Sequence, residues 1–182
     1  AIKTLLYRDP QRAVALLDHI ADVVAEHLTL QIEAGADAVQ IFDTWAGGLA
    51  PEDYVRFALP PTRKVLDRLA GLGVPRILFV NGIAGILPHV ATAGADVVSV
   101  DWRADLPAVA AALGDDVAVQ GNLDPVELFG PTDRIRARVR AIHRDLGRRT
   151  GHIFNLGHGI LPGTPVEGAD AFVQAVLELG GE

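Results

Sequence analysis

Apolar residues recur along this chain with two alternating spacings. Residues 11–34 carry them three and four positions apart, the period of a helix that packs on one face. Short apolar runs of strand length come next, each bounded by glycine, proline or polar residues. These runs cover residues 37–43, 75–80, 96–101, 116–122 and 152–157. The pattern predicts five strands separated by helices.

Helical spacing or helix-start signals appear between and after these runs. They predict helices over residues 51–71, 83–93, 106–113, 132–148 and 164–180. Asp9 followed by Pro10 is typical of a helix start. Pro60-Pro61 is expected to divide the helix over 51–71, because a proline ring clashes with the preceding turn. Residues 164–167, TPVE, predict a capping box at the start of the last helix.

Strands that alternate with helices predict a parallel sheet with right-handed crossovers. On length alone, 182 residues favour an open doubly wound sheet, for which five strands are a complete set. A (β/α)₈ barrel typically needs about 250 residues and eight strands. In both folds the loops at the carboxyl ends of the strands form the site. These loops are residues 43–49, 81–85, 101–103, 120–124 and 155–160.

Composition narrows the function classes. The net charge is −7, which argues against a nucleic-acid partner. The nearest thing to a basic patch is the arginine-rich segment 134–149, and it is interpreted as the solvated face of an amphipathic helix. The absence of cysteine excludes disulfides and thiolate metal ligands. No apolar run is long enough to span a bilayer and no signal peptide opens the sequence, so we expect a cytoplasmic protein without a membrane partner. The chain has no methionine, even at its start, which suggests part of a longer chain.

The predicted loops hold carboxylates, amides, two tryptophans and His158 rather than an evident catalytic set. No P-loop or GxGxxG motif is present, and no spacing indicates a metal site. His158 stands out because Gly157 and Gly159 flank it and let the backbone approach a ligand. Asp101 is interpreted as architectural, and so is Asp124 before Pro125, which is expected to cap the short helix that follows.

Four motifs in register, QIFDTWAGGL, GADVVSVDW, QGNLDP and IFNLGHGILPGTP, resemble the uroporphyrinogen decarboxylase family over essentially the whole chain. The resemblance implies a (β/α)₈ TIM-type barrel of nearly twice this length. It therefore replaces the open sheet with an α/β fold made of the C-terminal five β/α units of such a barrel, with parallel strands. We expect residues 1–182 to form a single domain that is a partial barrel of this family.

The resemblance also implies an activity. Family members are carboxy-lyases of haem and porphyrin biosynthesis. They remove CO₂ from the four acetate side chains of uroporphyrinogen, a polycarboxylate tetrapyrrole, to give coproporphyrinogen. They need no metal or organic cofactor and are commonly homodimers.

Three positions of this chain match substrate-binding positions of the family: Phe42 and Thr44 in the F-x-[ST] loop, and His158 in NLGHG. The family's catalytic aspartate and tyrosine and its arginine-rich loop lie upstream, so no catalytic residue is assigned here. The two glycines are expected to keep His158 accessible to a substrate carboxylate.

Two alternatives remain open from the residues. Corrinoid- and coenzyme M-linked methyltransferases share the barrel, but they bind zinc through cysteine and histidine, and this chain has no cysteine. The other alternative is a non-catalytic partial barrel that needs a partner chain, because five strands of a barrel leave an exposed edge.

Overall fold

A computed structural model describes residues 2–147 and 151–180 of the chain. It divides into two compact units, Ala1–Val97 and Val98–Glu182, which we describe one at a time. The five strands follow one another in a sheet in the order β1-β2-β3-β4-β5, so neighbours in sequence are neighbours in the sheet. The expectation of a single domain over residues 1–182 stays a prediction.

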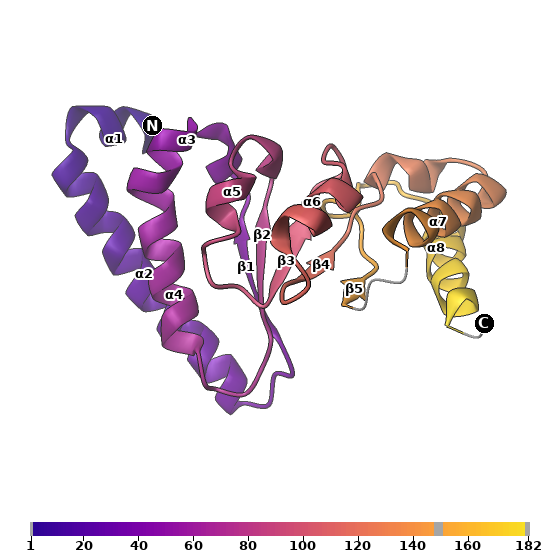
Figure 1. The fold of residues 1–182 in the computed structure, drawn as a ribbon, viewed down its shortest axis with the longest axis horizontal. Helices are drawn as coiled ribbons and strands as arrows, with labels where there is room; N and C mark the ends of the chain where they lie inside the picture. Colours follow the sequence, from indigo (N-terminus) through magenta and orange to yellow (C-terminus); the bar gives the residue numbers. More distant parts are fainter. Residues whose placement is uncertain (1, 148–150, 181–182) are drawn as a thin grey trace. The chain divides into compact units, whose positions relative to one another are not determined.

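The first unit begins with two helices that lead to two paired strands. Its elements are α1 (Ile2–Arg8), α2 (Pro10–Glu33), β1 (Val39–Asp43), the 3₁₀ turn η1 (Ala46–Gly48), α3 (Pro51–Asp53), the π-helical turn η2 (Tyr54–Ala58), α4 (Leu59–Leu69), β2 (Arg76–Val80), the 3₁₀ turn η3 (Ile83–Gly85) and α5 (Leu87–Val90). Strands β1 and β2 are parallel, with Phe42 opposite Phe79. The two longest helices of this unit, α2 and α4, lie side by side (Figure 1).

The core of this unit forms where α2, α4 and β1 meet. Small residues on α2 let the helix approach the strand, and larger apolar side chains of α4 fill the remaining space. The buried cluster consists of Ala21, Ala25, Leu28, Val39, Val65 and Leu69. Asp9 caps α2 by accepting a hydrogen bond from the Arg12 N–H at 3.1 Å, and Gly35 beyond the helix has φ +101°. Both ends of the predicted helix are confirmed.

The helix predicted over 51–71 is divided before its prolines rather than at them. Residues 54–58 form a π-helical turn, and Pro60 and Pro61 lie in the first turn of α4. A π turn is wider than an α turn, so it leaves room for proline rings that would clash with the carbonyls of a regular preceding turn.

Strand β3 (Val97–Val100) begins at the boundary of the units, and the second unit continues from it. Its other elements are α6 (Leu106–Leu113), β4 (Ala118–Gln120), the 3₁₀ turn η4 (Pro125–Phe129), α7 (Thr132–Leu146), β5 (His152–Ile153) and α8 (Val166–Leu179). Strands β4 and β5 are parallel, with Val119 opposite His152. Asp124 caps η4 by accepting from the Val126 N–H at 2.9 Å, as expected.

Two expectations for this unit are wrong in detail. The strand predicted over 152–157 ends at Ile153, and only an isolated bridge between Leu123 and Leu156 follows it. The Asn155 side chain accepts a hydrogen bond from the Leu156 N–H at 2.9 Å, a local side-chain bond of the kind that competes with a regular strand. The capping box at 164–167 does not form, because the Thr164 hydroxyl donates to the Leu161 carbonyl instead.

The helix predicted over 132–148 runs from Thr132 to Leu146, and residue 148 lies outside the described residues. Its buried face consists of Ile135, Val139 and Ile142, while its arginines face solvent and form ion pairs with Glu127, Asp145 and Glu178. The interpretation of a solvated arginine face is confirmed. Within residues 2–147 and 151–180, no helix has both the length and the apolar character needed to cross a membrane.

Candidate functional site

The first group of candidate residues lies where β1 ends. Side chains alternate along a strand, so Phe42 faces the opposite way from Ile41 and Asp43. Phe42 is 69% exposed, and its ring lies 6.0 Å from the Phe79 ring at an angle of 56°. Thr44 follows β1 directly and is half-buried. The structure therefore brings Phe42 and Thr44 together at one strand end.

The turn after Thr44 is held by its backbone. The Gly48 and Leu49 N–H groups donate to the Trp45 and Ala46 carbonyls, each at 3.0 Å, and the Lys3 ammonium donates to the Gly48 carbonyl at 2.9 Å. A Cβ on Gly47 would lie 2.0 Å from the Asn81 carbonyl oxygen. The turn is thus packed directly on the loop that follows β2.

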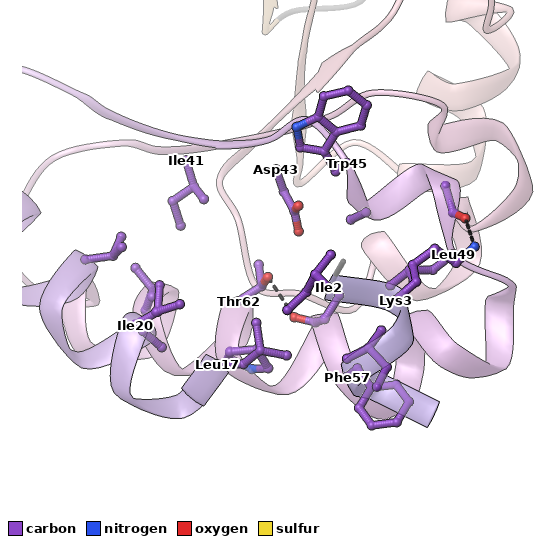
Figure 2. A pocket seen from close by; sticks show the side chains of 18 residues that line it. Ile2, Lys3, Leu17, Ile20, Ile41, Asp43, Trp45, Leu49, Phe57 and Thr62 are labelled. Atoms are coloured by element: carbon purple, nitrogen blue, oxygen red, sulfur yellow. Dashed lines mark hydrogen bonds between the residues drawn. The ribbon is translucent and has the colours of Figure 1, made fainter. Parts of the chain in front are cut away.

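The other face of β1 borders a cavity of about 430 Å³ between α1, α2, α4 and η1 (Figure 2). Its walls are mostly apolar, and the Asp43 carboxyl points into it between Ile41 and Trp45. Burial raises the pKa of Asp43, and a hydrogen bond from the Ala46 N–H partly offsets this effect.

Tyr54 is fully buried near this carboxyl, and its hydroxyl has no hydrogen-bond partner among the residues that the structure describes. Burial raises the pKa of Tyr54 strongly, and the charge of Asp43 adds to the shift. Sequence reasoning found neither this tyrosine nor the buried state of Asp43. Only the alternation of side chains along β1 could have indicated that Asp43 turns away from Phe42.

We expect Asp43→Asn to stabilise the protein at pH 7. The raised pKa means that the folded state binds the proton more tightly, so the ionised carboxylate costs stability above that pKa. This cost fades as the pH falls through the raised pKa toward the ordinary value of 3.8, and the advantage of the variant should fade with it. Urea denaturation of the chain between pH 3.5 and pH 8 measures the difference.

The matched control is Asp37→Asn, because Asp37 is an exposed carboxyl in the loop before β1. It should leave the free energy of unfolding unchanged across the same pH range. A constant or reversed difference between wild type and Asp43→Asn would contradict the burial of this charge.

His158, the third candidate, lies in the second unit. Its ring is exposed and meets the Trp102 ring edge-on, with centroids 6.1 Å apart and planes at 87°. The preceding Gly157 N–H donates to the Leu123 carbonyl at 2.7 Å. A Cβ on Gly157 would lie 2.2 Å from the Trp102 backbone nitrogen, whereas a Cβ on Gly159 would meet nothing within 4 Å. The expectation that both glycines only provide access is therefore incomplete, since Gly157 is also required for packing.

The loop after β3 supports this contact. Asp101 is 1% exposed and accepts hydrogen bonds from the Arg103 N–H and Nε–H at 3.1 and 2.8 Å. The Asn122 amide donates to the Asp101 and Ala104 carbonyls at 3.0 and 2.8 Å. Asp101 thus has the architectural role expected for it. Sequence reasoning missed Arg103, although its place directly after the DW pair was a signal.

A further histidine, His152, begins β5. His152 is half-buried, contacts the Gly121 carbonyl at 2.8 Å and packs against Phe154, and burial lowers its pKa. Within residues 2–147 and 151–180, no three histidine or carboxylate side chains are placed to hold a metal ion.

Comparison with known proteins decides the family. The sequence model described as Uroporphyrinogen decarboxylase (URO-D) matches residues 1–179, which is nearly the whole chain. The chain belongs to the uroporphyrinogen decarboxylase family. The resemblance predicted from the four motifs is confirmed.

Curated members of the uroporphyrinogen decarboxylase family are similar over the same range. The chain is 48% identical to the uroporphyrinogen decarboxylase of Carboxydothermus hydrogenoformans, over 97% of this chain and 51% of that protein. It is 47% identical to that of Gloeobacter violaceus, over 98% of this chain and 52% of that protein. The chain spans about half the length of the curated relatives that it matches.

A solved structure supports the fold. A methyltransferase from Methanosarcina mazei, of TIM-barrel type, superimposes with a TM-score of 0.87 at 22% identity, over 98% of this chain and 52% of that one. The prediction of an α/β fold made of five β/α units of a (β/α)₈ barrel is confirmed. At this identity the likeness concerns the fold alone.

Proposed function

We propose that this chain is part of a uroporphyrinogen decarboxylase, a lyase that releases CO₂ from the four acetate side chains of uroporphyrinogen to give coproporphyrinogen. The observation that carries the proposal is the family match over residues 1–179, together with relatives named uroporphyrinogen decarboxylase at up to 48% identity. The methyltransferase alternative has only a likeness of fold in its favour.

The proposed chemistry needs no metal or organic cofactor. Protonation of a pyrrole carbon creates a cation conjugated to the acetate methylene, and this cation takes up the electron pair of the breaking C–C bond as CO₂ leaves. The protein has to bind the anionic ring system and stabilise the cation by preorganised electrostatics. The groups that move the proton are assigned to the half of the relatives that this chain does not cover.

Three residues of this chain are proposed to bind the substrate. The exposed His158 ring donates a hydrogen bond to a carboxylate, and Trp102 limits the rotation of that ring. The Thr44 hydroxyl supplies a second polar contact, and the exposed Phe42 ring offers an apolar wall to a pyrrole. A cytoplasmic homodimer is proposed for the complete protein.

A chimera tests the proposal. The residues of this chain replace the matched half of the Carboxydothermus hydrogenoformans protein. The purified chimera should decarboxylate uroporphyrinogen in the presence of a chelator, while residues 1–182 alone should not. A folded chimera without turnover would contradict the proposed function. Robust turnover by residues 1–182 alone would contradict the assignment of the proton-transfer groups to the other half.

In the chimera we expect His158→Ala to raise KM at least about tenfold, with kcat changed by less than about threefold. A hydrogen bond to a charged group contributes about 1.5–3 kcal/mol, and 1.4 kcal/mol corresponds to a factor of ten. His158→Gln retains an N–H donor, so its KM should lie between that of the wild-type chimera and that of His158→Ala. An unchanged KM with a collapsed kcat would instead make His158 a proton donor.

A further inference from the structure

Arg103 and the proposed substrate contact His158 both contact the ring of Trp102. The Arg103 guanidinium carbon lies 4.9 Å from the centroid of the Trp102 ring, and the His158 ring contacts the same indole edge-on. A guanidinium over an aromatic face is held by the ring quadrupole. One tryptophan thus brings two nitrogen-rich side chains to the same part of the second unit.

The buried Asp101 carboxylate fixes the orientation of the Arg103 side chain. Its Nε–H donates to the Asp101 carboxylate, which is 1% exposed, while the Arg103 side chain remains 53% exposed. The carboxylate is therefore buried and the guanidinium is at the surface. Coulomb energy falls with distance, so an anion that arrives from solvent is attracted more strongly by the guanidinium than it is repelled by the buried carboxylate.

A neighbouring cavity does not suit an anionic substrate. Trp102 also lines a space of about 400 Å³. Its walls include four carboxylates against one cation, Arg138, which pairs with Glu127 at 3.8 Å; the carboxylates are those of Asp105, Asp124, Glu127 and Asp145. Like charges across a contact cost free energy, so this acidic space should repel a polycarboxylate. This space is therefore a poor place for the carboxylates of the substrate.

We propose that Arg103 binds a substrate carboxylate beside the one bound by His158, so that this part of the site recognises carboxylates in pairs. The inference rests on the proposed function. Each pyrrole of uroporphyrinogen carries one acetate and one propionate on adjacent carbons, so its eight carboxylates come in close pairs. A planar guanidinium suits carboxylate recognition, and its contact with Trp102 limits the freedom lost on binding. Arg103 thereby becomes a specificity determinant for the octacarboxylate.

Arg103→Gln in the chimera tests this assignment. KM for uroporphyrinogen should rise about tenfold, with kcat within about twofold of wild type. Inhibition of the chimera by porphyrins should distinguish a role of Arg103 in binding carboxylates from a merely structural role. The inhibition constant of uroporphyrin, with eight carboxylates, should rise about tenfold, whereas that of coproporphyrin, with four isolated propionates, should change less than twofold. An equal rise in the inhibition constants of both porphyrins, or no rise in that of uroporphyrin, would overturn the inference.

Controls keep the outcome interpretable. Arg140→Gln, on the exposed face of α7, removes an equally exposed cation that pairs with Glu178 and should change neither constant. If Arg103→Gln does not fold, Arg103→Lys retains the charge and should raise the uroporphyrin constant about threefold while leaving the coproporphyrin constant unchanged. An inactive wild-type chimera contradicts the proposed function, whereas an active chimera whose porphyrin selectivity is unaffected by Arg103→Gln contradicts only the role of Arg103.

Discussion

Gly157→Ala is expected to lower the free energy of unfolding by about 3 kcal/mol and to weaken substrate binding together with it. The added Cβ would lie 2.2 Å from the Trp102 backbone nitrogen and 2.8 Å from its Cα. These are backbone atoms, which cannot rotate out of the way as a side chain can. Overpacking of this kind costs about 1–3 kcal/mol when the surroundings are well packed. Urea denaturation measures the loss.

Gly159→Ala is the matched control on the other side of His158. Its Cβ would meet nothing within 4 Å, so stability should change by less than about 0.5 kcal/mol. Equal effects of the two substitutions would show that the clash with Trp102 does not decide the conformation of this loop. The comparison also tests whether the close approach of Gly157 to Trp102 sets the position of the His158 side chain. If it does, KM of the chimera should rise in Gly157→Ala and not in Gly159→Ala.

Gly47→Ala should have an effect of similar size in the first unit. The added Cβ would lie 2.0 Å from the Asn81 carbonyl oxygen and 2.8 Å from that of Gly82, so the turn after β1 would have to move off the loop after β2. We expect a loss of about 3 kcal/mol. Trp45 is 85% exposed in the same turn, and its fluorescence should change when the turn moves.

Gly48→Ala is the neighbouring control, because a Cβ at Gly48 meets no atom within 4 Å. It should leave both the unfolding free energy and the Trp45 emission close to wild type. If Gly47→Ala behaved like Gly48→Ala, the turn that carries Thr44 would have to be adaptable rather than packed on the loop after β2. In that case Thr44 would be a poor candidate for a fixed contact.

Much of this protein could be predicted from the sequence. Periodicity located all five strands and the long helices, because burial on one face imposes a repeat of about 3.6 on helices and apolar runs on buried strands. Asp9 and Asp124 were identified as caps because a cap depends on residues only two or three positions away. The motif that contains His158 was found because its glycines and histidine are contiguous. These features are local, and local patterns can be read along the chain.

The remaining features depend on contacts between residues far apart in sequence. One exception is local, because the Thr164 hydroxyl donates to the Leu161 carbonyl three positions earlier and so overrides a capping pattern. The end of β5 depends on how its backbone departs from β4. A glycine is required at position 47 because the Asn81 backbone lies against it, and at position 157 because the Trp102 backbone, 55 positions away, lies against it. Burial of Asp43, and the placement of Arg103 and His158 around one indole, likewise follow from packing. The sequence by itself determined the elements and the family. Only the tertiary structure decided which side chains share an environment, because burial and electrostatics depend on distance in space rather than on separation along the chain.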